Sequence, residues 1–391
     1  MKKKIAILGS TGSIGVTTLN IVKKKENLIL IDTLIAKSNY KKIIYQIKRF
    51  KPKKFIIEDL KTYLKIKKNI KTKTKLFCGL EKFSLNQAKY DMTVSAVPGI
   101  AGLKSTIFFT KNSKQILLAN KESIICGWSL IKKISKKNNC KIIPLDSEHF
   151  SIYQLIKDKK DNEIDKIFIT ASGGPFLFTP LKKFKNITPK DALKHPKWNM
   201  GKKISIDSAT LMNKIFELIE AQKIFNIDKE KFEIVIHPQS LVHAIVRFKN
   251  GITKFLYHET DMTIPIANAI FNSSINIKNF LKTKKNEDVK KLEFFKVDKS
   301  RFPAINIVPK LNKFKSTPII INAANEILVD QFLKRKIRFN SIFRYLYLVL
   351  RDKNYKKYAI QSPNNIKSIF TIDQWSRDTT LGIIKMYNKL K

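Results

Sequence analysis

The sequence predicts an α/β protein. We expect an N-terminal Rossmann-like, doubly wound parallel sheet, a central α/β catalytic domain with a lid, and a small helical C-terminal domain. Three observations predict this class. Short apolar runs alternate with helical patterns through the first third of the chain, which indicates βαβ units. A glycine-rich turn follows the first apolar run, and residues 301–391 carry mainly helical periodicity.

Length, charge and cysteine content narrow the class further. A chain of 391 residues is long enough for two or three domains. The sequence contains no run of about 18 apolar residues, so we expect no membrane span. The net charge of +46 comes from lysines spread over every segment. Nucleic-acid binding would need that charge on one face, so a nucleic-acid partner is not expected. Three scattered cysteines predict a reducing, cytoplasmic location.

The first domain is expected to span residues 1–135 and to bind a dinucleotide. Its predicted elements are strands at 4–9, 27–36, 54–58, 90–97 and 115–119, a helix at 40–50 and a solvated surface element at 61–75. Gly9, Gly12 and Gly15 open the first helix, where a backbone without side chains can approach a pyrophosphate. The spacing is GxxGxxG rather than GxGxxG, so a tight turn without a ligand is the alternative.

The end of the second strand favours NADP over NAD. NAD enzymes usually place an acid there to bind the ribose 2′-hydroxyl. This chain has Lys37, Ser38 and Asn39 at that position, and Asp32 lies in mid-strand. A cation with two hydrogen-bonding side chains suits a 2′-phosphate.

The second domain is expected over residues 136–274, with a mixed sheet. Its predicted strands lie at 140–145, 166–171 and 232–236, followed by a hairpin of 243–248 and 253–257 around Asn250-Gly251. Residues 275–300 are expected to be a linker, because 275–291 carry too much charge for a core.

The most informative stretch runs from His195 to Ala221. Its second half has the periodicity of a helix, with Asp207 or Ser208 as cap. On that helix Asn213, Lys214 and Glu217 share one face. A cation near a helix N-terminus suits a phosphate, and a carboxylate one turn later suits a metal or a proton. The alternative is an amphipathic surface helix with a solvated polar face.

Three further features complete the candidate site. Residues 190–208 are expected to form a lid that brings His195 and Trp198 to the substrate. Asp146 and Glu148 follow the strand at 140–145 and would point the same way in an extended segment. With Glu217 they would make an oxygen-ligand site for Mg²⁺ or Mn²⁺, unless they are solvated loop residues.

Polar loops also follow the strands that end at residues 119 and 171. Ligands of open α/β sheets bind beyond such strand ends. We expect Ser172, Ser208, Asn213 and Lys214 to hold a phosphate, and Lys121 to polarise a substrate oxygen. His149 is expected to support the acid pair. His237 and His243 are expected to be structural.

Six motifs in order resemble the 1-deoxy-D-xylulose 5-phosphate reductoisomerase family: GSTGSIG, LLANKES, PLDSEH, ASGGPF, HPKWNMGKKISIDSATLMNK and IHPQSLVH. The resemblance covers almost the full length, including INAANEI and IRF. It implies a three-domain homodimer that uses NADPH and a divalent ion, Mg²⁺ or Mn²⁺ with Co²⁺ as a further candidate. The implied reaction isomerises and reduces 1-deoxy-D-xylulose 5-phosphate to 2-C-methyl-D-erythritol 4-phosphate, in non-mevalonate isoprenoid precursor biosynthesis.

The resemblance also implies residue roles. Asp146, Glu148 and Glu217 would bind the metal and, with Lys121 and His195, form the catalytic set. The substrate would contact Ser147, Ser172, His195, Trp198, Ser208, Asn213, Lys214 and Glu217, with Met200 in the flap. NADPH would contact Thr11, Gly12, Ser13, Ile14, Lys37, Ser38, Asn39, Asn120, Lys121, Glu122 and Gly201. The carbon skeleton would rearrange by retro-aldol cleavage or a direct shift, before hydride reduces the aldehyde.

Some positions depart from the family pattern. Ile215 stands where a glycine is usual, Pro98 takes an aliphatic slot, and residues 258–272 differ from the usual GEPDMRTPI form. None of these changes removes an implied metal ligand or phosphate anchor.

Two other readings stay open at this point. A short-chain dehydrogenase would use a Tyr-x-x-x-Lys pair, as at Tyr153 and Lys157, but the same spacing recurs at Tyr63 and Tyr387 and lysine abundance explains it. A basic nucleotide- or nucleic-acid-binding protein would show salt-sensitive DNA binding without NADPH oxidation.

Overall fold

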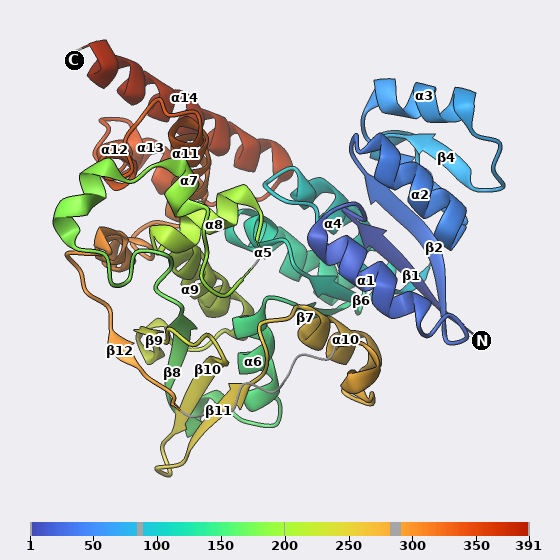
Figure 1. The fold of residues 1–391 in the computed structure, drawn as a ribbon, viewed down its shortest axis with the longest axis horizontal. Coiled ribbons are helices and arrows are strands. Elements are labelled where there is room, and N and C mark those ends of the chain that lie inside the picture. Colours follow the sequence, from blue (N-terminus) through green and yellow to red (C-terminus); the bar gives the residue numbers. More distant parts are fainter. Residues whose placement is uncertain (1, 84–88, 199, 282–290, 390–391) are drawn as a thin grey trace. The chain divides into compact units, whose positions relative to one another are not determined.

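The computed structural model describes residues 2–83, 89–198, 200–281 and 291–389 (Figure 1). The chain divides into two compact units. Unit 1 comprises Met1–Ser123, Trp128–Phe150 and Asp261–Glu287, and unit 2 comprises Ile124–Gly127, Ser151–Thr260 and Asp288–Lys391. Both units are discontinuous in sequence, whereas the predicted domains are continuous. The division of the chain into a nucleotide-binding, a catalytic and a C-terminal domain stays a prediction.

Unit 1 is built on a seven-stranded parallel sheet in the order β4-β3-β2-β1-β5-β6-β7. Its strands are β1 (Lys3–Leu8), β2 (Ile29–Ala36), β3 (Lys54–Ile57), β4 (Lys75–Cys78), β5 (Tyr90–Ser95), β6 (Ser113–Leu118) and β7 (Lys141–Pro144). Ile5 to Leu8 are wholly buried, as expected for a parallel strand covered on both faces. The strand order reverses between β1 and β5, which is where doubly wound sheets bind ligands. The Rossmann-like prediction is confirmed.

Helices connect these strands, and their caps and apolar faces follow from the sequence. The first five are α1 (Ser13–Lys23), α2 (Tyr40–Phe50), α3 (Leu60–Asn69), α4 (Gly102–Thr110) and α5 (Lys121–Lys137). In α2, Asn39 accepts a hydrogen bond from the Lys42 N–H at 3.2 Å, and Ile43 and Ile47 are buried. Two more helices are α6 (Ser147–Leu155) and α10 (Thr263–Phe271), and α10 packs against α1.

The segment at 61–75 forms most of α3 and the start of β4 and is mostly exposed, so the expectation of a solvated surface element is confirmed. Two other expectations about this region were wrong. The strand predicted at 140–145 is β7, which pairs with β6 in the first sheet and not with the second. An apolar run shows that a strand is buried but does not identify its neighbour. Part of the expected linker also packs, since Phe280 is buried. Residues 282–290 lie outside the described ranges.

Unit 2 contains a five-stranded mixed sheet in the order β11-β10-β8-β9-β12. Its strands are β8 (Ile164–Ala171), β9 (Phe232–Ile236), β10 (Val242–Phe248), β11 (Thr253–Tyr257) and β12 (Phe295–Lys296). Strands β8 and β9 are parallel and the other pairs are antiparallel. The predicted hairpin around Asn250-Gly251 is confirmed as β10 and β11.

The helices of unit 2 fall into two stretches of the sequence, one between β8 and β9 and the other after β12. They are α7 (Pro189–Ala192), α8 (Lys202–Ala209), α9 (Met212–Phe225), α11 (Thr317–Leu333), α12 (Ser341–Val349), α13 (Tyr355–Ala359) and α14 (Ile366–Lys389). Helix α9 packs against β8 and β9, and α11 packs against α12 and α14. The predicted helical C-terminal region is confirmed. Within the described ranges, no helix is both long and apolar enough to cross a bilayer.

The cap predicted for α9 was wrong. Asp207 and Ser208 lie inside α8, and the residue that precedes α9 is Leu211, with φ of +66°. Leucine rarely adopts this left-handed conformation, so sequence propensity gave no sign of the break between the two helices.

Candidate active site

The glycine turn of unit 1 leaves the N-terminus of α1 open to solvent. Gly9 has φ of +79°, and a Cβ there would lie 2.5 Å from the Ala96 carbonyl oxygen, so only glycine fits between β1 and β5. Gly12 caps α1 without a side-chain hydrogen bond. Gly12 and Ser13 are exposed, and Thr11 and Ile14 are half-buried. The first N–H groups of α1 can therefore face an anion.

The residues at the end of β2 are arranged as the NADP prediction requires. Lys37, Ser38 and Asn39 are exposed and follow the strand directly. Asp32 is buried within β2, 3.7 Å from the Lys54 ammonium. Asp32 therefore lies away from the end of β2, where an acid would bind the ribose 2′-hydroxyl of NAD.

The start of α5 joins β6 to the turn after β5. Asn120 caps α5 by accepting from the Ser123 N–H at 2.6 Å, and its amide donates to the Val97 and Gly99 carbonyl oxygens. Asn120 is buried and also bonds Glu122 at 3.3 Å. Its observed contacts are those of a residue that shapes the loop, a role that the sequence motif did not reveal.

The acid pair lies at the start of α6 and not in an extended segment, so that part of the prediction was wrong. The Asp146 carbonyl oxygen accepts from the Phe150 N–H at 2.8 Å, which makes Asp146 the helix cap. Ser147 donates to Glu148 at 2.7 Å. The Lys121 ammonium lies 3.0 Å from Asp146. These carboxylates and Lys121 therefore form one charged group within unit 1.

Helix α9 carries the second charged group, within unit 2. Lys214 and the amide of Asn213 each donate to Glu217, one to each carboxylate oxygen. Glu217 is 1% exposed and Lys214 5%. The predicted shared face is confirmed, and it is buried rather than solvated, so the surface-helix alternative was wrong.

Ser172 and His195 form the next part of the site. The His195 Nδ1 accepts from the N–H groups of Lys197 at 3.2 Å and Trp198 at 2.9 Å. Burial, with the nearby Lys214 charge, lowers the His195 pKa to about 4. The ring is therefore neutral at pH 7, and its protonated Nε2 donates to Ser172 Oγ at 3.0 Å.

The loop after β8 packs closely on the end of α8. Ser172 Oγ also accepts from the Gly174 N–H at 3.1 Å. Gly174 has φ of +65°, and a Cβ there would meet the Ser208 carbonyl oxygen at 2.9 Å. Ser172 and Ser208 thus lie on neighbouring backbone segments. The Ser172 oxygen accepts from His195 and from Gly174, so the hydroxyl's own proton is directed to neither of them.

The predicted lid contains the short helix α7, the segment to Gly201 and most of α8. The Trp198 ring meets the His243 ring edge-on at a centroid distance of 6.1 Å. Gly201 is exposed and caps α8, and Met200 is half-buried. Asn199 lies outside the described ranges.

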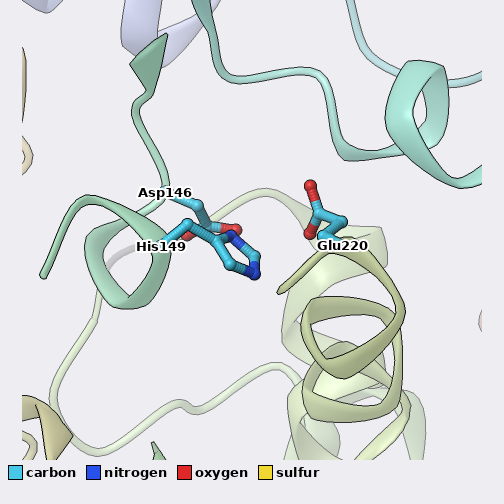
Figure 2. Close-up of side chains that lie close together, drawn as sticks. All are labelled: Asp146, His149 and Glu220. Carbon is cyan, nitrogen blue, oxygen red and sulfur yellow. The ribbon is translucent and has the colours of Figure 1, made fainter. Parts of the chain in front are cut away.

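Two buried acids of unit 2, Asp207 and Glu220, were not assigned to the site by sequence reasoning, which gave Asp207 only as a helix cap. Asp207 pairs with Lys203 at 3.0 Å and accepts from Asn325 at 2.7 Å, which ties α8 to α11. Glu220 is 1% exposed on α9, three residues after Glu217, and that spacing could have indicated it. Figure 2 shows Glu220 on α9, and Asp146 with His149 at the start of α6.

His237 and His243 were expected to be structural, and the hydrogen bonds of His243 fit that role more fully than those of His237. His243 is satisfied through the His258 carbonyl oxygen at 3.0 Å. His237 Nδ1 lies 2.8 Å from the Glu293 carbonyl oxygen, whereas its buried Nε2 has no hydrogen-bond partner among the described residues.

The departures from the family pattern leave both charged groups in place. Ile215 is wholly buried on α9. Pro98 lies in the turn whose carbonyl oxygens Asn120 binds, so the turn keeps its anchor. Asp146 and Glu148 belong to unit 1 and Glu217 to unit 2, so their use of one ion is a proposal, taken up below.

Three family models match the chain. One described as 1-deoxy-D-xylulose 5-phosphate reductoisomerase covers residues 5–127, and its C-terminal domain model covers 142–225. A further DXP reductoisomerase C-terminal domain model covers 258–379. Together these models account for most of the chain.

Named relatives agree with the models over nearly their whole length. The 1-deoxy-D-xylulose 5-phosphate reductoisomerase of Pelagibacter ubique (strain HTCC1062) is 47% identical over 382 residues, covering 95% of this chain and 97% of the relative. The enzyme of the same name from Wolbachia pipientis wMel is 40% identical, covering 96% of each chain.

Solved structures give the same result. A DOX-P reductoisomerase in complex with NADPH, fosmidomycin and magnesium has a TM-score of 0.92 at 33% identity, with 99% of each chain covered. The Zymomonas mobilis enzyme in complex with NADPH has a TM-score of 0.88 at 31% identity, covering 98% of this chain and 99% of that one. This chain therefore belongs to the 1-deoxy-D-xylulose 5-phosphate reductoisomerase family.

Proposed function

We propose that this protein catalyses the NADPH- and divalent-metal-dependent isomerisation and reduction of 1-deoxy-D-xylulose 5-phosphate to 2-C-methyl-D-erythritol 4-phosphate. This reaction belongs to non-mevalonate isoprenoid precursor biosynthesis. The observation that carries the proposal is the buried group of Asn213, Lys214 and Glu217 on α9, in a chain 47% identical to a named reductoisomerase. Membership of this family displaces the short-chain dehydrogenase alternative.

The nucleotide is held by unit 1. The N-terminus of α1, which no side chain caps, would bind the pyrophosphate, with Thr11, Gly12, Ser13 and Ile14 around it. The 2′-phosphate is recognised by Lys37, Ser38 and Asn39 at the end of β2. NADPH supplies the hydride that reduces the aldehyde formed by rearrangement. We extend the nucleotide contacts to Asn120, Lys121 and Glu122 in unit 1, and to Gly201 in unit 2.

The substrate phosphate is held by unit 2. Ser172 already accepts from His195 and Gly174, so its own hydroxyl proton is available to a phosphate oxygen. Ser208, Asn213 and Lys214 add further donors. Because this binding energy comes from a group that does not react, it can drive closure of the segment that carries His195 and Trp198.

The metal ligands are Asp146, Glu148 and Glu217. Their fit rests on chemistry, because carboxylate oxygens are the preferred ligands of Mg²⁺ and Mn²⁺. Lys214 pairs with Glu217, and Lys121 pairs with Asp146. A divalent ion in this site acts as a Lewis acid toward the substrate's carbonyl and hydroxyl oxygens.

Lys214 changes partner when the site fills. Its ammonium moves from Glu217 to the phosphate, which releases a Glu217 oxygen for metal binding. Phosphate and metal therefore bind more tightly together than apart. Ser147 and Lys121 contact the substrate's hydroxyl oxygens and hold the carbon skeleton in place during rearrangement.

The test is loss of NADPH absorbance on adding 1-deoxy-D-xylulose 5-phosphate, with and without Mg²⁺ or Mn²⁺. The proposal requires oxidation that depends on both substrate and metal. Metal-independent oxidation with simple ketones would contradict it, as would salt-sensitive DNA binding with no oxidation.

Assembly and location complete the proposal. We propose a homodimer, which light scattering of the full chain tests, a monomer being the contrary result. We also propose a cytoplasmic location, supported by the three cysteines scattered through the sequence, which are too few and too dispersed for a disulfide framework. Recovery of the enzyme in a membrane or extracellular fraction would contradict it.

A further inference from the structure

Unit 2 contains a cavity that the proposed reaction does not use. Its volume is about 240 Å³, and its walls come from the short helical segments Leu181–Asn186 and Pro303–Lys310, from α12, and from the link between α8 and α9. Most of the lining is apolar. Phe184 and Phe339 form one wall, with ring centroids 6.1 Å apart.

The volume sets the size of molecule that fits. In another protein, an apolar cavity of about 150 Å³ stays dry and binds benzene. A cavity of about 240 Å³ therefore holds one aromatic ring with short substituents, on the order of ten non-hydrogen atoms.

Arg301 supplies the charge preference of this cavity. Its Nη1 donates to the Phe176 carbonyl oxygen at 2.7 Å and to that of Thr179 at 2.6 Å. Its Nη2 has no hydrogen-bond partner among the described residues, and its nearest carboxylate, the exposed Asp298, is 3.9 Å from Nε. The side chain is only 15% exposed. A largely buried guanidinium beside an apolar space is complementary to a carboxylate.

The cavity also touches the entrance to α9. Thr210 and Met212 line it, and they flank Leu211, whose left-handed backbone is a conformation of high energy for leucine. The next two residues are Asn213 and Lys214. A molecule that packs against Thr210 and Met212 therefore stabilises the backbone from which the proposed phosphate donors project.

We propose that this cavity binds a small aromatic carboxylate, with its ring among the phenylalanines and its carboxylate on Arg301, and that binding tightens phosphate binding at the start of α9. The coupling to phosphate rests on the proposed function of Lys214. Binding to the cavity itself does not.

The binding test uses the full chain, with 4-methylbenzoate as probe and neutral 4-methylacetophenone as its uncharged counterpart. In calorimetry, the Kd for 4-methylbenzoate should be at least tenfold lower than the Kd for 4-methylacetophenone. Ala304→Leu, which fills the cavity, should abolish binding. Arg301→Met should weaken it at least tenfold, whereas Arg247→Met, the same change at a surface arginine of unit 2, should leave it unchanged. Equal binding of ketone and acid, or unchanged binding by Ala304→Leu, overturns the proposal.

A measurement on the unmodified protein keeps the test independent of variant folding. NMR should show a nuclear Overhauser effect between the probe's methyl group and the Met212 methyl group, and its absence at saturating probe overturns the assignment. Saturating 4-methylbenzoate should also lower the Kd for inorganic phosphate at least threefold, and an unchanged Kd overturns the coupling. If the probe binds but the chain fails to oxidise NADPH, the proposed function fails and this cavity assignment stands.

Discussion

Replacing Lys214 by methionine tests the charge balance of α9. Met keeps most of the side-chain volume but removes the Lys214 ammonium that donates to Glu217, which is 1% exposed. Breaking a buried ion pair by removing one partner costs about 3–5 kcal/mol. We expect the free energy of unfolding at pH 7 to fall by that amount, since one carboxylate oxygen loses the Lys214 donor while the Asn213 amide continues to donate to the other. Urea denaturation measures it.

Two further variants separate the pair from a general loss of charge. The double change Lys214→Met with Glu217→Gln removes the buried carboxylate too, so it should lose less than about 1.5 kcal/mol. Lys334→Met breaks the exposed pair with Asp330 and should lose less than about 1 kcal/mol. Mg²⁺ should restore stability to Lys214→Met but not to the double variant. Equal losses in the single and double variants would refute the reasoning.

The remaining predictions concern turnover, pH and nucleotide choice. Glu217→Gln should abolish turnover while the Kd for NADPH stays within about twofold, and a parallel loss of both in a titration would count against the metal role. As the pH falls from 6.5 toward about 4, the unfolded chain protonates His195 before the folded chain does, because the folded pKa is about 4. Stability should therefore fall over that range, and by less in His195→Gln; matching curves for the two proteins would be inconsistent with this. Lys37→Asp should raise KM for NADPH at least tenfold and leave KM for NADH nearly unchanged, and an unaltered ratio of the two would argue against Lys37 as the 2′-phosphate ligand.

Local periodicity accounts for what the sequence could predict of the site. Residues three and four apart share a helix face whatever the surrounding fold, so the contacts of Asn213 and Lys214 with Glu217 follow from spacing alone. Turn residues between apolar runs are a second local signal, and they identified the glycine turn before α1 and the hairpin at Asn250-Gly251.

Tertiary context decided the rest. Two acids separated by one residue suit an extended segment and a helix start equally well, and only the fold made Asp146 a helix cap. The resemblance gave Asn120 only a nucleotide contact, and only the fold shows that its amide also binds carbonyl oxygens more than twenty positions away. The break at Leu211 carries no glycine or proline signal, so propensity predicted a cap at Asp207 or Ser208 instead.

The central claim is that Asp146, Glu148 and Glu217 hold one divalent ion together. Anomalous diffraction from crystals of the full chain grown with Mn²⁺, NADPH and inorganic phosphate tests it directly. We predict one manganese peak within bonding distance of all three carboxylates, with Lys214 turned to the phosphate. A manganese ion bound without Glu217, or no ordered manganese at all, would contradict the account.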